Sequence, residues 1–148
     1  MDNQQDYPML RLLKIYTKDL SFENPNAPEV FLEQEQKYKV DFNLELDNRQ
    51  LDEDHWEISI LLYAEVVDAD DEDLVLFIID LEHAGVFLVK NIPHEHMERV
   101  MAVDAPTMLF PFTRQLVSQT SVDGGFLPFL LDPINFMAFY EKSKSQAN

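Results

Sequence analysis

The sequence contains no cysteine, and this excludes both a disulfide framework and a thiolate metal site. With only three glycines, it lacks the glycine-rich loops that bind phosphates and dinucleotides. Its longest uninterrupted apolar run, Leu74–Ile79, is far too short to span a bilayer. The first residues, MDNQQDYPML, lack the basic-then-apolar order of a signal peptide. We therefore expect a cytoplasmic protein with no direct membrane insertion and no cofactor.

Basic side chains are also scarce, since 11 Lys and Arg face 28 Asp and Glu, for a net charge of −17. Phosphate binding needs Lys and Arg, so nucleic acid is not an expected partner, and charge repulsion disfavours anionic membranes. Fifteen acidic side chains but a single basic one, Arg49, lie between Asp41 and Glu82. Such a concentrated negative surface favours a basic protein partner, although the same charge also serves solubility.

Length and composition predict a single domain over residues 1–148. The chain has 148 residues, and 46% of them are hydrophobic, which is enough to bury a full core. Residues 1–9 and 141–148 are expected to be flexible ends. The sequence shows no internal repeat and no low-complexity segment that would divide the chain.

Alternating apolar and polar residues predict four strands in the first part of the chain. They cover Leu10–Phe22, Tyr38–Leu46, Trp56–Val66 and Leu74–Glu82. The proline-bearing segment Glu23–Phe31 predicts an extended loop after the first strand, and Gly85 is expected to break the pattern after the last. The later links are short and polar with no helix between strands, so the strands should pair antiparallel.

The rest of the chain has a helical period. Helices are predicted over residues 94–103 and 107–122, with Pro106 as the break between them. Gly124-Gly125 should end the second helix, and Asp132-Pro133 should begin a third. The second helix should bury one stripe of side chains: Leu109, Phe112 and Leu116. Strands followed by helices indicate an α+β fold, with an antiparallel sheet and helices packed on one of its faces.

Two polar clusters resemble metal sites. His94 and His96 are two residues apart, whereas a pair of helical zinc ligands needs a spacing of four, so we expect both to be exposed in a first helical turn. The acidic run Asp68–Asp73 lacks the glycine and distal glutamate of a calcium loop and should form a solvated hairpin turn. His55 and His83 are expected at strand ends without a partner. With no nucleophile beside a base, the sequence predicts no metal and gives no case for an enzyme.

The chain is rich in aromatic residues, with eleven Phe, five Tyr and one Trp. Phe22 and Phe31 flank the proline-bearing loop, and Phe126 and Phe129 lie in the link before the last helix. Because extended loops cannot bury every ring they carry, we expect an apolar groove that binds extended peptides. Two other interpretations stay open, in which the rings close the ends of the core or form an oligomer interface.

The fourth predicted strand suggests a docking surface. One of its faces is entirely apolar and should meet the helices: Val75, Phe77, Ile79 and Leu81. The other is mixed and should be exposed: Leu74, Leu76, Ile78 and Asp80. Exposed Ile78 beside Asp80, on an acidic sheet surface, is typical of a site that docks a basic protein.

Two segments, IYTKDLSFENPNAP (Ile15–Pro28) and LFPFTRQLVSQTSVDGGF (Leu109–Phe126), strongly resemble the SecB family of bacterial protein-export chaperones. Phe77–Phe87 and Pro128–Phe136 extend the likeness in the same order. The resemblance implies a homotetramer, a dimer of dimers, whose subunits each carry a four-stranded antiparallel sheet and packed helices. It also implies an ATP-independent chaperone that binds unfolded preproteins, keeps them translocation-competent and delivers them to the translocase motor SecA.

The resemblance further implies roles for three sets of residues. Motor docking falls on Asp19, Glu23, Ile78 and Asp80. The client groove falls on Phe31, Tyr38, Phe126, Phe129, Phe136 and Tyr140, with Tyr38 in place of a loop tryptophan found in relatives. Subunit assembly falls on Met108, Leu109, Phe112 and Leu116. Two alternatives are a SecB-like chaperone dedicated to one client and a non-chaperone oligomeric adaptor whose aromatic residues serve its own assembly.

Overall fold

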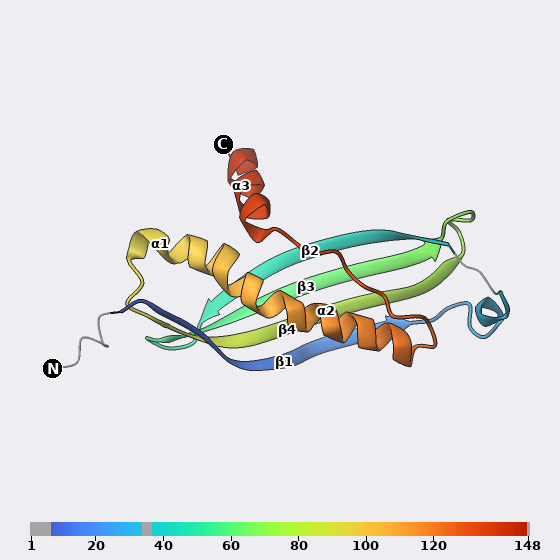
Figure 1. Ribbon diagram of the computed structural model, residues 1–148, viewed down its shortest axis with the longest axis horizontal. Helices are drawn as coiled ribbons and strands as arrows, with labels where there is room; N and C mark the ends of the chain where they lie inside the picture. The colour runs from blue at the N-terminus through green and yellow to red at the C-terminus, as the bar shows by residue number, and fades with distance from the viewer. Residues whose placement is uncertain (1–6, 34–36, 148) are drawn as a thin grey trace.

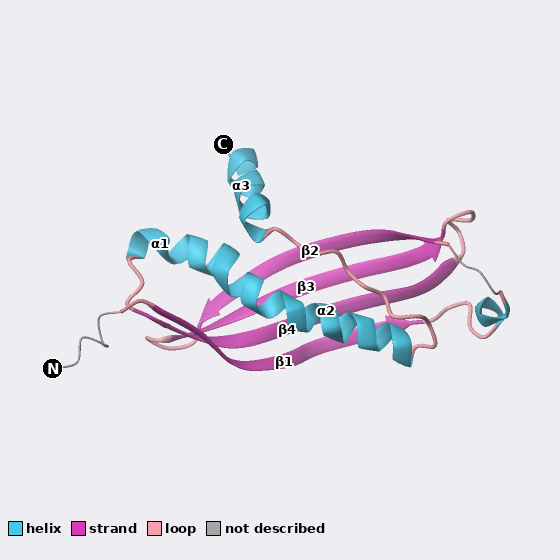
Figure 2. Cartoon of the chain, viewed as in Figure 1, coloured by secondary structure: helices cyan, strands magenta, loops and turns pink. Residues whose placement is uncertain are grey.

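The computed structural model describes residues 7–33 and 37–147, which form one sheet and the helices that cover it. The strands are β1 (Met9–Glu23), β2 (Tyr38–Gln50), β3 (His55–Asp68) and β4 (Val75–Lys90). They pair antiparallel in the spatial order β1-β4-β3-β2 (Figure 1). The long helix lies across one face of this sheet (Figure 2). The predicted α+β class, with a four-stranded antiparallel sheet and helices on one face, is therefore confirmed.

The two faces of the sheet differ because side chains alternate along each strand. Beneath the helices, β3 presents a row of aliphatic side chains that are at most 1% exposed: Ile58, Ile60, Leu62, Ala64 and Val66. The opposite face carries polar and charged side chains, and the helices of the described ranges leave it uncovered. We call this opposite face the open face.

The fourth strand is longer than predicted, because it does not break at Gly85 but continues to Lys90. Gly85 pairs with Ile15 of β1 on one side and with Ile58 of β3 on the other. A β-carbon at this position would lie 2.8 Å from the Leu12 Cδ1 atom. Glycine here leaves room for the Leu12 side chain of β1, and it does not end the strand.

A helical run crosses the sheet without the break predicted at Pro106. It consists of α1 (His94–Arg99), the π-helical turn η3 (Val100–Asp104) and α2 (Ala105–Asp123). The Ala105 N–H bonds the Val100 carbonyl, and this wider turn accommodates Pro106 at the start of α2. Within residues 7–33 and 37–147, no helix is long and apolar enough to cross a membrane.

Helix α2 buries a different stripe from the predicted one. Its buried side chains are Ala105, Pro106, Leu109, Phe110, Thr113, Val117, Thr120 and Ser121. Leu109 belongs to the predicted stripe, but Phe112 is 44% exposed and Leu116 is only partly buried. The predicted and the observed stripe both have helical spacing, so periodicity alone did not specify which face of α2 packs against the sheet.

The glycine pair ends α2 as predicted. The Phe126 N–H bonds the Ser121 carbonyl and the Gly125 N–H bonds the Val122 carbonyl, both at 3.0 Å. Gly125 has a φ of 98°, a conformation that other residues rarely adopt. This is the Schellman pattern of helix termination, and it turns the chain back toward the sheet.

The last helix, α3 (Phe136–Ala147), begins later than the predicted start at Asp132. The Asn135 side chain provides the cap, since its Oδ1 accepts a hydrogen bond from the Ala138 N–H at 3.0 Å. Phe136 anchors the helix to the body, with its ring centroid 5.7 Å from that of Phe110. The rest of α3 projects beyond β2 (Figure 1), and residues 141–147, expected to be a flexible end, are helical.

Candidate functional site

The antiparallel register places twelve open-face side chains in three rows across β1, β4, β3 and β2. The rows are Glu23, Ile78, Glu65 and Asp41; Ser21, Asp80, Tyr63 and Asn43; and Asp19, Glu82, Leu61 and Glu45. Seven of these side chains are Asp or Glu and none is Lys or Arg. We call the twelve residues the acidic platform.

The acidic platform is compact and mostly uncompensated. Strand spacing and the two-residue repeat give it a side of roughly 14 Å. One of its carboxylates, Glu82, is paired, since its Oε2 lies 3.6 Å from the Lys18 Nζ. Within the described residues, the other six have no Lys or Arg nitrogen within 4 Å. Such a density of negative charge attracts a basic partner and disfavours an acidic one.

All four predicted docking residues lie on the acidic platform. Asp19 and Glu23 come from β1, while Ile78 and Asp80 come from β4. Glu23 and Ile78 are direct partners in the ladder, and Asp80 stands opposite Ser21. The three acids are exposed and Ile78 is half-buried, so the structure brings these four side chains together on one accessible surface.

The predicted faces of β4 are wrong at its first residues. The β3–β4 register shifts between Val66, which pairs with Phe77, and Val67, which pairs with Val75. Leu76 is therefore the extra residue of a β-bulge, and it is 2% exposed rather than on the exposed face. Val75 moves to the open side of the ladder, opposite to its predicted face.

The β2 and β3 half of the acidic platform was not among the predicted site residues. It contributes Asp41, Asn43, Glu45, Leu61, Tyr63 and Glu65. The alternation of β3 already placed the last three on the face opposite its apolar row. The missing information was which strands would be neighbours, because the β1-β4-β3-β2 order is long-range and no local pattern specifies it.

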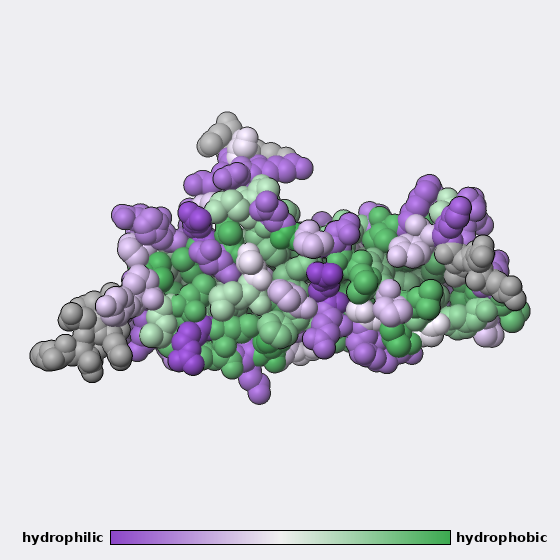
Figure 3. Space-filling view, viewed as in Figure 1, coloured by the Kyte–Doolittle hydropathy of each residue, from purple (hydrophilic) through white to green (hydrophobic). Residues whose placement is uncertain are grey.

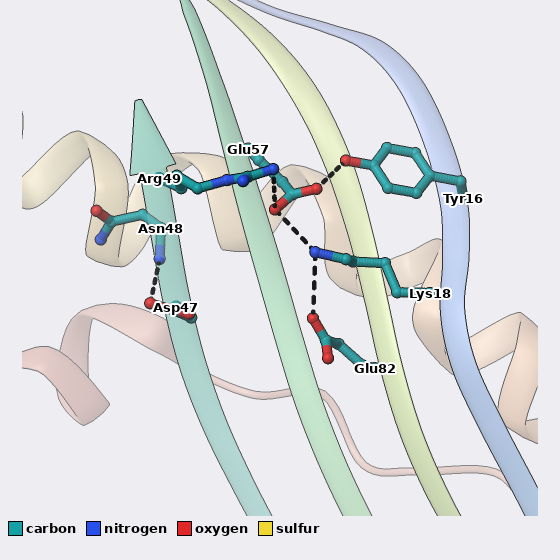
Figure 4. Close-up of polar contacts among 7 residues, drawn as sticks. All are labelled: Tyr16, Lys18, Asp47, Asn48, Arg49, Glu57 and Glu82. Carbon is teal, nitrogen blue, oxygen red and sulfur yellow. Dashed lines mark hydrogen bonds and ion pairs between the residues drawn. The ribbon is translucent and has the colours of Figure 1, made fainter. Parts of the chain in front are cut away.

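Toward the opposite end of the sheet, the open face carries a compensated charge cluster (Figure 4). Tyr16 Oη donates a hydrogen bond to Glu57 Oε2, while Lys18 Nζ and Arg49 Nη2 lie 3.1 and 3.6 Å from Glu57 Oε1. The bond from Tyr16, followed by Lys18 and Arg49, holds the pKa of the Glu57 carboxyl below its ordinary value despite burial. Burial and the bond to Glu57 raise the pKa of Tyr16 to about 12.

A second surface is a groove that we call the aromatic groove, with a volume of about 380 Å³. It is lined by Val30, Phe31, Glu33, Tyr38, Val66, Leu76, Phe77, Gly125, Phe126, Leu127, Pro128 and Phe129. Ring contacts connect its walls, with centroids 4.8 Å apart for Phe77 and Phe126 and 5.2 Å apart for Phe31 and Phe126. Rings from the proline-bearing loop and from the link after α2 thus meet over the beginning of β4, at Phe77.

The aromatic groove continues into a second apolar hollow of about 380 Å³. Tyr38 and Phe129 line both hollows, and Val40, Phe42 and residues 130–134 complete the second. Leu127 is 88% exposed and Leu130 is 63% exposed. Hydrophobic side chains show at the surface of this helix-covered side (Figure 3). The result is an accessible apolar strip suited to an extended chain.

Polar side chains hold the loops of the groove in place. Ser121 Oγ accepts a hydrogen bond from the Phe129 N–H at 2.9 Å. The Asn24 amide donates to the Gly124 carbonyl at 2.9 Å, and the Asn26 amide donates to the Val75 carbonyl at 2.8 Å. The proline-bearing loop is not extended throughout, because it contains the short 3-10 helix η2 (Glu29–Leu32).

Four of the six predicted groove residues, Phe31, Tyr38, Phe126 and Phe129, line the aromatic groove. The structure does not bring Phe136 and Tyr140 to it. Phe136 is 2% exposed and packs in the core. Tyr140 lines a separate hollow of about 810 Å³ between α1, α3 and the ends of β2 and β3. The cause is the later start of α3, which carries both residues away from the loop rings.

The outer side of α2 carries the predicted assembly residues, with one exception. Met108 is 37% exposed, Phe112 is 44% exposed, and Leu116 is partly buried. Leu109 is fully buried beneath α2, because it lies on the helix face that packs against the sheet. Of the four predicted assembly residues, three therefore remain at least partly exposed on α2.

The histidines differ from expectation in two cases. His83 lies within β4 and is buried, with its Nδ1 2.7 Å from the Thr113 Oγ1 atom, and burial lowers its pKa. His55 Nδ1 lies 2.8 Å from Asp52 Oδ1. His94 and His96 are exposed in the first turn of α1. Among the described residues, no group of three or more His, Asp or Glu is placed to hold a metal ion.

Comparisons with known proteins point to one family. The SecB family model, described as Preprotein translocase subunit SecB, matches residues 3–147. The Protein-export protein SecB of Desulfotalea psychrophila is 55% identical over 145 residues, which cover 98% of this chain and 92% of that protein. The Protein-export protein SecB of Magnetococcus marinus is 42% identical over 139 residues, which cover 94% and 87%.

A solved structure shares the fold. It is the Mycobacterium tuberculosis Rv1957 SecB-like chaperone in complex with a ChAD peptide from the Rv1956 HigA1 antitoxin. The TM-score is 0.68, with 84% of this chain and 90% of that chain covered. At 15% sequence identity, this likeness is one of architecture.

Proposed function

We propose that this chain, which belongs to the SecB family of protein-export chaperones, binds unfolded preproteins without ATP, keeps them translocation-competent and delivers them to the SecA motor. The observation that carries the proposal is the separation of two surfaces that share no residue. The aromatic groove is apolar and suits an unfolded chain. The acidic platform lies on the open face and suits a basic protein.

The aromatic groove provides affinity without sequence specificity. Burying one aromatic or aliphatic side chain is worth about 1.5–3 kcal/mol. Several such contacts, repeated over the subunits of an oligomer, hold one long client by avidity. A folded client has buried its apolar segments and has nothing to place in the groove, so recognition ends when the client folds.

The acidic platform allows the client to be transferred to SecA. SecA docks on Asp19, Glu23, Ile78 and Asp80 while the client occupies the other surface, so both partners are held at once. SecA then competes with the aromatic groove for the client and draws the client away. Release depends on this competition because the chain acts by binding and carries out no catalysis.

The working form is a homotetramer, a dimer of dimers, in the bacterial cytoplasm. Met108, Phe112 and Leu116 on the outer side of α2 contribute to its assembly, since exposed apolar side chains on a long helix favour burial between subunits. The partners are unfolded preproteins and SecA, and neither nucleic acid nor the membrane interior is among them.

The test mixes the purified protein with a reduced, unfolded preprotein and measures mass by light scattering. We expect a stable complex on an assembly of four 17.3 kDa chains and none with the folded client. A tetramer that ignores unfolded chains would contradict the proposal and favour an adaptor. Binding of one preprotein among many unrelated ones would favour a dedicated chaperone instead.

A further inference from the structure

Tyr63 occupies an inner position of the acidic platform. It stands in the middle row on β3, with Asp80 of β4 opposite it on one side and Asn43 of β2 on the other. Its side chain is 36% exposed on the open face. Leu61 and Glu65 lie before and after it on the same face of β3. It is therefore an exposed aromatic side chain in the middle of a carboxylate surface.

Carboxylates from three strands act on the Tyr63 ring. Its Oη donates a hydrogen bond to the Glu65 Oε2 atom at 3.2 Å. Burial and then Glu65 raise its pKa, with further contributions from Asp41 on β2 and Glu23 on β1. The hydroxyl is protonated, as in an ordinary tyrosine, and hydrogen-bonded to Glu65, so the ring carries no charge.

Two lysines near the open face, Lys18 and Lys39, form ion pairs with carboxylates, and one of these carboxylates is Glu82 of the platform itself. Lys18 lies between Glu57 and Glu82, and Lys39 lies 3.0 Å from Glu72. Within the described residues, the one cation placed over an aromatic ring is Lys144, above Tyr140 on α3. The Tyr63 ring and its carboxylates are thus free to receive a cation from another molecule.

We propose that Tyr63 is the specificity-determining residue of the acidic platform and receives an arginine or lysine side chain of a basic protein partner. This inference rests on the proposed docking of SecA and names the side-chain chemistry that the docking uses. The face of an aromatic ring attracts a cation, and surrounding carboxylates satisfy its N–H groups. Tyrosine is also enriched among residues that dominate interface energies.

The ring adds what carboxylates alone do not provide. Exposed carboxylates attract any cation over a distance, and salt screens that attraction. A ring face binds only at contact and in one orientation, and it buries the apolar stem of the partner side chain. The carboxylates therefore set how fast a basic protein arrives, and Tyr63 sets where its cation comes to rest.

The test measures the dissociation constant for SecA with three variants of the full-length protein. Tyr63→Leu keeps apolar bulk but loses the ring, and we expect an increase of about three- to thirtyfold. Tyr63→Phe keeps the ring face and loses only the bond to Glu65, so it should stay within about twofold of wild type. Tyr7→Leu is the matched control and should leave the dissociation constant unchanged, because Tyr7 is an exposed tyrosine outside both the acidic platform and the aromatic groove.

The salt dependence distinguishes contact from charge. Tyr63→Leu changes no charge, so the slope of log Kd against log salt should stay at the wild-type value, while Glu65→Gln should lower it. A change in the NMR chemical shifts of the labelled Tyr63 ring when SecA is added would detect the contact without any substitution. If wild type binds SecA and Tyr63→Leu binds equally well, or if Tyr63→Phe loses as much as Tyr63→Leu, the inference is wrong and the proposed function stands. If wild type does not bind SecA, the handover part of the proposed function fails and the inference fails with it.

Discussion

Glu23 of β1 and Ile78 of β4 are direct cross-strand partners, so an acidic and an apolar side chain from distant parts of the chain lie side by side on the open face. β4 alone places Ile78 beside Asp80, and the ladder adds Glu23 from β1. The pairing exists only when the first and last strands are neighbours in the sheet. This surface forms only when the sheet has folded, so it suits a partner that must bind the folded protein and not the unfolded chain.

Leu127→Asp should weaken client binding by about tenfold or more while leaving the free energy of unfolding unchanged. Leu127 is 88% exposed, so little stability depends on it, but a charge there makes the aromatic groove unfavourable for apolar side chains. Titration of an unfolded preprotein measures the effect. Leu51→Asp, at an exposed leucine in the turn after β2, is the control and should bind clients normally. Equal affinity of Leu127→Asp and wild type would place the client elsewhere.

Glu57→Gln should lower the free energy of unfolding by about 1–3 kcal/mol at neutral pH, because charge-assisted bonds from Tyr16 and Lys18 are lost in a buried place. The Glu57 pKa is lower in the folded state than its ordinary 4.5, so the carboxylate stabilises the fold fully above that pH. The contribution disappears as the pH falls below 4.5 through the folded-state pKa.

Denaturant titrations of wild type and Glu57→Gln across this range measure the difference. The two curves should converge in acid and separate above pH 4.5. A constant difference at every pH would mean that the substitution acts through packing rather than through the charge.

His83→Gln should remove a pH dependence from the stability. Burial lowers the pKa of His83 below its ordinary 6.5, so the unfolded chain binds a proton more readily than the folded one. Stability is therefore full above pH 6.5 and falls as the pH drops from 6.5 through the folded-state pKa. Glutamine keeps a polar group near Thr113 but does not titrate, so its stability should be flat over this range.

The control for His83 is His94→Gln, since His94 is exposed at the start of α1 and should change nothing. Thermal unfolding in a series of buffers checks both variants. If His83→Gln keeps the full pH dependence of wild type, another group carries it.

Local patterns account for much of this fold. The alternation in β2 and β3 predicted their faces, and Gly124 and Gly125 predicted the end of α2. These features succeed because each depends on the conformation of a few neighbouring residues. The same holds for Asp80, whose place on the open face follows from the alternation of β4.

Other features depend on contacts that a local pattern does not contain. The bulge at Leu76 is set by the pairing of β3 with β4 and changes which side chains line the groove. Asn135 caps α3 in place of Asp132, and this carries Tyr140 to another hollow. The neighbours of Tyr63 on the acidic platform likewise depend on the strand order, which no local pattern specifies.

The most direct measurement compares Asp80→Lys with Glu95→Lys for binding to SecA and to an unfolded preprotein. The two variants make the same change in charge, one on the acidic platform and one on the exposed surface of α1. We predict that Asp80→Lys weakens SecA binding by at least about tenfold and leaves client affinity at the wild-type value, while Glu95→Lys changes neither. Equal loss of both activities in Asp80→Lys, or loss of neither, would contradict the separation of the docking and client surfaces.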